Sequence, residues 1–158
     1  MCMFNLEKLI WTESDFLEMG WHDSIIYSSF AKIDDYEFVL DLDYIFNRVK
    51  PELEGDSFNF WVSPVTMVFQ NVSDIKVNIE SQQGEIEVSD LLMESPELTP
   101  NGKYTSHIYR FECQQGSISL RATGFKMYVK QLPKFQSSYC LTLKDRNGIT
   151  FVRECTAL

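Results

Sequence analysis

The chain has 158 residues, of which 44% are hydrophobic and 14% aromatic, and it carries a net charge of −9 at pH 7. This length and apolar content predict a single domain, residues 1–158, with a full core, and exclude a disordered chain. The excess of carboxylates opposes binding to nucleic acid or to an anionic membrane, because both need Lys and Arg at the contact. A basic protein is the macromolecular partner that this charge favours, although charge also serves solubility alone.

The four cysteines, Cys2, Cys113, Cys140 and Cys155, are scattered along the chain and form no C-x-x-C pair. Their spacing therefore predicts neither a zinc site nor a redox site, and we expect no cofactor. The N-terminus has no cationic stretch followed by a long apolar one, so no secretory signal is predicted. We expect a cytoplasmic protein with reduced thiols.

The predicted elements begin with a short helix and a hairpin. Thr12 or Ser14 can cap a helix of one or two turns that ends at Gly20. The two segments that follow, residues 25–33 and 37–46, predict antiparallel strands joined by a tight acidic turn.

The second strand of this hairpin alternates cleanly between two kinds of side chain. One face is predicted to belong to the core and consists of Phe38, Leu40, Leu42, Tyr44 and Phe46. The other face consists of Glu37, Val39, Asp41, Asp43 and Ile45. We expect it to present Asp41 and Asp43 side by side toward solvent or toward a concavity.

Residues 57–71 form the longest apolar run, and the rest of the chain is predicted to pack around them. The run is rich in aromatic and β-branched residues and contains Pro64, a combination that favours strand over helix. It predicts either two strands or one strand bent at Ser63-Pro64, buried on both faces.

Further strands are predicted downstream, separated by short turns, over residues 75–80, 85–91, 104–113, 117–130, 141–144 and 149–153. Residues 93–102 predict a loop, and Gly124 predicts a bulge because the apolar residues change phase there. Asn147-Gly148 predicts a hairpin turn. Together these signals indicate an all-β fold, an antiparallel sandwich or partly open barrel of about 8–10 strands with a short N-terminal helix.

No catalytic motif stands out, so we expect a protein that is not an enzyme and holds no metal. His22 adjoins Asp23, but neighbours on a strand point to opposite sides, and His107 lies in the middle of another predicted strand. Asp41 and Asp43 can serve as a general acid–base pair or hold a hard cation. A half-exposed strand produces the same pattern without any such role.

Several short motifs resemble those of a group of small, largely uncharacterised bacterial all-β proteins. The motifs are Trp21-His22-Asp23, Leu40-Asp-Leu-Asp-Tyr44, Phe60-Trp-Val-Ser-Pro64 and Ala122-Thr-Gly-Phe-Lys-Met-Tyr128. Some proteins of this group resemble immunity proteins that accompany secreted or contact-delivered toxins. The resemblance transfers no active-site residue, and the chain after Pro133 lies outside it.

Three functions follow from these observations. The first is a non-enzymatic, cytoplasmic immunity protein that blocks a basic toxin with an acidic face. Its candidate partner-binding residues are Asp34, Asp35, Glu37, Asp41, Asp43, Glu52, Glu54 and Asp56. The second is a barrel whose aromatic strands line a small-ligand cavity. The third is a hydrolase with Asp41, Asp43, His22 or His107 as acid–base groups, which requires that these groups converge. The oligomeric state and the identity of the partner stay open.

Overall fold

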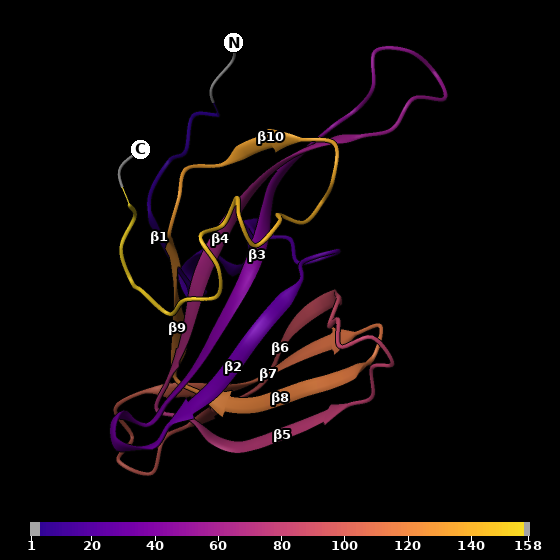
Figure 1. The fold of residues 1–158 in the computed structure, drawn as a ribbon. Coiled ribbons are helices and arrows are strands. Elements are labelled where there is room, and N and C mark those ends of the chain that lie inside the picture. Colours follow the sequence, from indigo (N-terminus) through magenta and orange to yellow (C-terminus); the bar gives the residue numbers. More distant parts are fainter. Residues whose placement is uncertain (1–3, 157–158) are drawn as a thin grey trace.

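The computed structural model describes residues 4–156 and is an all-β sandwich (Figure 1). Within these residues the chain forms, in order, β1 (Ile10–Thr12), the 3₁₀ helix η1 (Glu13–Glu18), β2 (Ile26–Lys32), the 3₁₀ turn η2 (Ile33–Asp35), β3 (Glu37–Val49), β4 (Asn59–Gln70), β5 (Ser73–Ile79), β6 (Val88–Leu98), β7 (Thr105–Cys113), β8 (Gly116–Ala122), β9 (Gly124–Val129) and β10 (Lys134–Gln136). The strands form two antiparallel sheets and no closed barrel, so the predicted fold class is confirmed.

The larger sheet has the strand order β1-β9-β4-β3-β2, with β10 also paired to β4, and the smaller sheet has the order β5-β8-β7-β6. In Figure 1 the long strands β2, β3 and β4 run obliquely across the view, and the smaller sheet lies below them. The core lies between the two sheets. No helix within residues 4–156 is long and apolar enough to cross a membrane.

The predicted helix is confirmed as a short 3₁₀ helix. The side chain of Thr12 accepts a hydrogen bond from the backbone N–H of Ser14, and the Asp15 carboxylate accepts one from the backbone N–H of Thr12. These contacts satisfy donors that a helix leaves unpaired at its start.

Strand β4 is the centre of the larger sheet, as the apolar run predicts. It is one continuous strand that pairs with β3 on one side and with β9 and β10 on the other. Pro64 lies between the ends of β9 and β10, where its carbonyl accepts a hydrogen bond from the N–H of Lys130 at 2.9 Å. Because proline has no N–H to return, the Lys130 carbonyl accepts the backbone N–H of Thr156 instead, also at 2.9 Å. Because of the proline, the Lys130 carbonyl is available to bind Thr156, near the end of the described chain.

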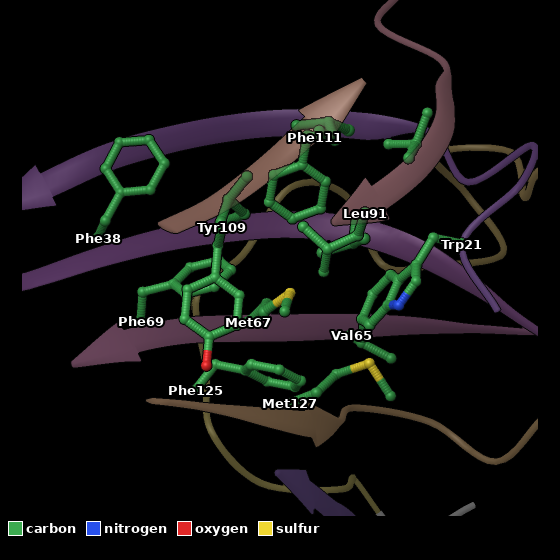
Figure 2. Packing of buried hydrophobic residues seen from close by; sticks show 14 of the residues in the cluster. Trp21, Phe38, Val65, Met67, Phe69, Leu91, Tyr109, Phe111, Phe125 and Met127 are labelled. Atoms are coloured by element: carbon green, nitrogen blue, oxygen red, sulfur yellow. The ribbon is translucent and has the colours of Figure 1, made fainter. Parts of the chain in front are cut away.

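Aromatic side chains from both sheets fill the core (Figure 2). Trp21 packs edge-on against Tyr44, Phe111 and Phe125, with ring centroids 5.2, 6.3 and 6.2 Å apart. Phe69 contacts the rings of Phe111 and Phe125 as well. The core face predicted for β3 is confirmed. Since these rings pack on one another, the expectation that they line a ligand cavity gains no support.

The strand predicted over residues 117–130 is in fact two strands in different sheets. β8 belongs to the smaller sheet and β9 to the larger one, and the chain crosses between them at Thr123. The apolar phase changes because both strands face one core from opposite sides, so the predicted bulge at Gly124 is wrong. Gly124 instead gives room to Glu13, whose carboxylate accepts a hydrogen bond from the N–H of Phe125 at 3.2 Å.

The loop predicted over residues 93–102 is too long, because β6 continues to Leu98. The strand passes through Pro96 with an irregular register between Glu94 and Glu97, where Ser95 has a positive φ of 51°. β6 is the outer strand of its sheet, and an edge strand tolerates a proline because one side of its backbone needs no partner.

The hairpin predicted at Asn147-Gly148 does not form. Both residues have positive φ, 59° and 78°, but the N–H of Gly148 donates to the carbonyl of Leu143 within a compact turn. Residues 137–156, which we call the C-terminal segment, contain no strand or helix. An Asn-Gly pair indicates positive φ values at both residues, and such values also occur in turns that do not join two strands.

We predict that Gly116→Ala destabilises the fold much more than Gly84→Ala does. Both glycines have positive φ, 141° and 87°, so an alanine at either position is strained by about 1–2 kcal/mol. A Cβ at Gly116 would lie 1.9 Å from the carbonyl oxygen of Asn78, whereas Gly84 has no atom within 4 Å. The overlap adds about 1–3 kcal/mol. Urea unfolding of both variants measures the difference, and equal losses would contradict it.

Candidate functional site

Asp41 and Asp43 lie on the outer face of β3, as the alternation predicts, but both are completely buried. The expectation that they face solvent is therefore wrong. The C-terminal segment crosses this face and covers both carboxylates. Two cations, Lys130 and Arg146, are buried beside them and form ion pairs with them. The physical reason is that a buried carboxylate needs both a counter-charge and hydrogen-bond donors, and this segment brings most of them.

Asp41 receives four hydrogen bonds. Arg146 donates from Nη1 to Oδ2 at 2.9 Å and from Nη2 to Oδ1 at 2.7 Å, so the pair is bidentate. The ammonium of Lys130 donates to Oδ1 at 2.7 Å, and the backbone N–H of Thr150 donates to Oδ2 at 2.9 Å. Both oxygens are satisfied, which removes most of the cost of burying the charge.

Asp43 is satisfied in the same way by three donors. Its Oδ1 accepts a hydrogen bond from Nε of Arg146 at 3.2 Å, and its Oδ2 accepts the N–H of Leu141 and the hydroxyl of Tyr27, both at 2.8 Å. The ring of Tyr27 lies under the guanidinium, with the Arg146 Cζ 3.9 Å from the ring centroid. We call Tyr27, Asp41, Asp43, Lys130 and Arg146 the buried ionic network.

Protonation in this network follows from burial and charge. Burial raises the pKa of Tyr27 far above its usual value, and the Asp43 carboxylate raises it further, so the phenol stays a donor. Burial lowers the pKa of Lys130, and its bond to Asp41 acts in the opposite direction. Burial also raises the pKa of Asp43, whereas its hydrogen-bond donors act to lower it. For Arg146, burial alone lowers the pKa, but the two carboxylates outweigh it and raise the pKa.

The two histidines do not converge. His22 is exposed, and its Nδ1 lies 2.9 Å from Oδ1 of Asp23, a contact that the prediction of opposite sides missed because Asp23 is in a turn with φ of 72°. The N–H of Asp23, the neighbour of His22, donates to the carbonyl of Val88, and Val88 pairs with Cys113. His22 therefore lies near the end of β7 that contains Cys113. His107 is six residues away from Cys113 along β7, about 20 Å at the rise of a strand.

The remaining predicted contact residues lie at opposite ends of β3. Asp34, Asp35 and Glu37 lie at the turn between β2 and β3, whereas Glu52, Glu54 and Asp56 belong to the loop between β3 and β4. That loop projects away from the sandwich at the far end of the strand in Figure 1. With 13 residues in β3, the ends are about 40 Å apart. The eight predicted residues therefore do not form one face.

An acidic hollow of about 460 Å³ lies at the first of these ends. Its lining is polar and consists of Glu13, Asp35, Glu37, Gln70, Asn71, Tyr104 and Thr123, with no Lys or Arg among these residues. A second hollow of about 430 Å³ shares Asn71, Tyr104 and Thr123 with it and continues toward the loop between β6 and β7. We call the first of these the acidic hollow. Within residues 4–156, no group of His, Cys, Asp and Glu is arranged to hold a metal ion.

The sequence pointed to Asp35 and Glu37 but missed Glu13 and Tyr104. Glu13 belongs to η1, and its carboxylate is placed here by the N–H of Phe125. Tyr104 comes from the turn before β7 and is 58% exposed. No local signal links these residues, because the fold brings them together from segments far apart in the sequence.

The chain matches no protein-family model, no curated protein and no solved structure. Its function must therefore be argued from its own geometry.

We predict that Asp41→Asn destabilises the fold by about 3–5 kcal/mol, because it leaves Lys130 and Arg146 buried with one carboxylate fewer. The matched control is Asp34→Asn on the exposed turn, which should change stability by no more than about 0.5 kcal/mol. Urea unfolding compares the two variants. If Asp41→Asn were as mild as its control, the network would not hold the C-terminal segment.

Proposed function

We propose that the protein is a non-enzymatic binding protein that neutralises a basic protein toxin, as immunity proteins do, and that it contacts this partner with the acidic hollow. The observation that carries the proposal is the lining of this hollow. Three carboxylates, those of Glu13, Asp35 and Glu37, surround it and no cationic side chain lines it. The chain as a whole carries a charge of −9, which attracts a basic partner from a distance.

The carboxylates of the hollow differ in how far they are neutralised. Asp35 is paired with Lys32 at 2.8 Å, and Glu37 is paired with Arg153 at 2.6 Å. Glu13 forms no ion pair within residues 4–156 and accepts only the N–H of Phe125. A Lys or Arg of the partner that enters the hollow would meet an uncompensated carboxylate at Glu13.

The neutral residues of the hollow suit contact with a protein surface. Gln70, Asn71 and Thr123 offer amide and hydroxyl groups, which can donate and accept hydrogen bonds. Tyr104 adds an exposed ring with a polar end, the combination that is enriched in protein interfaces. A basic segment with neighbouring polar groups would therefore be bound by both charge and hydrogen bonds.

The other two functions have less support. The aromatic strands pack on one another rather than around a ligand, and the histidines lie far from each other while Asp41 and Asp43 are sealed by cations. Cytoplasmic location belongs to the same proposal. The cysteines within residues 4–156 are free thiols, as expected in a reducing compartment.

We predict that the triple variant Glu13→Gln, Asp34→Asn, Asp35→Asn binds the basic partner at least about tenfold more weakly, because it removes two charges that line the hollow and a third, that of Asp34, on the turn beside it. The matched control is Glu52→Gln, Glu54→Gln, Asp56→Asn, which changes the net charge equally at the other end of β3. It should weaken binding much less, since distant charges are screened.

The bait tested as the partner is the product of the neighbouring gene, which is co-expressed and purified with the protein at low salt. Calorimetry at low and high salt then gives the affinity of both variants. Equal weakening by the two would show that only total charge matters, and no effect of either would remove the acidic hollow from the interface.

A further inference from the structure

Arg146 occupies the buried ionic network in the way that a ligand occupies a binding pocket. A guanidinium has five N–H donors in a fixed plane, and here each has an acceptor. Nε donates to Asp43, and the two terminal nitrogens donate to both oxygens of Asp41. The remaining two N–H groups are directed at the carbonyls of Gly148, at 2.8 Å, and Leu42, at 3.4 Å. A lysine ammonium cannot satisfy this arrangement.

Almost all of this pocket belongs to the sheet. Asp41, Leu42 and Asp43 come from β3 and Tyr27 from β2, so a rigid hairpin fixes the acceptors and the stacking ring. Only the carbonyl of Gly148 and the guanidinium itself come from the C-terminal segment. We call Tyr27, Asp41, Leu42 and Asp43 the arginine socket.

We infer that the arginine socket is a binding site for an arginine side chain of the basic partner, and that the chain's own Arg146 fills it in the partner's absence. This inference rests on the proposed function, since it assumes a basic protein partner. It adds a second contact and names the side chain that the partner uses.

The C-terminal segment is attached in a way that permits exchange. It contains no strand, and apart from the N–H of Thr156, which binds the backbone carbonyl of Lys130, side chains of the sheet hold much of it, as when Asp41 and Asp43 accept the N–H groups of Thr150 and Leu141. Among its hydrophobic residues within the described chain only Leu141 is buried, while Leu143, Ile149 and Val152 are each about half exposed. Segments with few buried apolar contacts open at lower free energy than the core.

Emptying the socket without replacement is unfavourable, because it leaves two buried carboxylates short of counter-charge. An incoming arginine restores the bidentate bond to Asp41, the bond to Asp43 and the contact with Tyr27. The cost of exchange is then the loss of the segment's other contacts. Among them are the bonds of Leu141 and Thr150 to the carboxylates, the bond from Thr66 to the Val152 carbonyl and the packing of Phe151 on Phe30, and contacts made by the partner must offset this loss. A ligand shifts such an equilibrium only by its preference for the open state, and an arginine has that preference.

The acidic hollow is connected through Glu37 to the C-terminal segment that fills the socket. This carboxylate lines the hollow and also binds Arg153 of the C-terminal segment, at 2.6 and 3.2 Å. A partner cation in the hollow competes with Arg153 for Glu37 and so loosens one attachment of the segment. Binding at the hollow thereby favours entry of an arginine at the socket.

The first test is chemical rescue of the full-length variant Arg146→Ala. Its melting temperature should fall, and about 10 mM methylguanidinium should raise it again by about 3 °C or more. Methylammonium at the same concentration is the matched control and should have no such effect, and neither compound should stabilise the wild type. If Arg146→Ala does not fold, the melting temperature of Arg146→Lys is compared with that of the wild type. It should be lower, since an ammonium neutralises the carboxylates but leaves acceptors unfilled, and equal melting temperatures would overturn the socket. Absence of a rescue specific to methylguanidinium overturns the socket.

The second test is hydrogen exchange of the wild-type protein with and without the co-purified basic partner. The N–H groups of Leu141 and Thr150, which bind the socket carboxylates, should exchange about tenfold faster in the complex. Unchanged or slower exchange overturns the inference, even where the variants of the hollow confirm the proposed function. If methylguanidinium rescues Arg146→Ala but no basic protein binds the wild type, the socket stands as a guanidinium site, whereas the proposed function and the partner's arginine are both overturned.

Discussion

Two buried carboxylates on the outer face of β3 determine how the last part of the chain is arranged. Asp41 and Asp43 lie on a strand flanked by β2 and β4, whose backbone groups are engaged in the ladders. Their donors must therefore come mainly from elsewhere, and Arg146, Leu141 and Thr150 supply them from the C-terminal segment. A segment without strands or helices is thus fixed in place by the requirement that no buried charge stays unpaired.

Pro64 directs the chain toward this network. Because Pro64 cannot complete its hydrogen-bonded pair with Lys130, the carbonyl of Lys130 is free to accept both the N–H and the hydroxyl of Thr156. The ammonium of the same lysine binds Asp41 and the carbonyl of Thr150. The residue that follows β9 therefore joins the central strand, the buried carboxylate and two points in the second half of the C-terminal segment.

Alternation of side chains predicted the faces of β3 correctly, since a strand exposes successive residues on opposite sides whatever lies above them. It could not predict that the outer face is covered, because cover is supplied by residues about a hundred positions later, such as Arg146. The same limit explains Gly124, where a change of phase marks a crossing between sheets. In the acidic hollow, Asp35 and Glu37 were predicted from a local turn, but Glu13 and Tyr104 depend on tertiary contacts that no local pattern encodes.

The C-terminal segment is held by buried charged groups of the sheet, and this determines which ligand can replace it. Apolar side chains of equal volume often stabilise a protein as well as a buried ion pair does, but they accept many partners and positions. The arrangement around Arg146 accepts one planar group in one orientation. The arrangement therefore fixes one closed position of the C-terminal segment, and another guanidinium is the group that can compete with Arg146 for the site. Glu37 lines the acidic hollow and binds Arg153. A cation that binds in the hollow therefore weakens one attachment of the C-terminal segment, although Asp41 and Asp43 beneath the segment are buried.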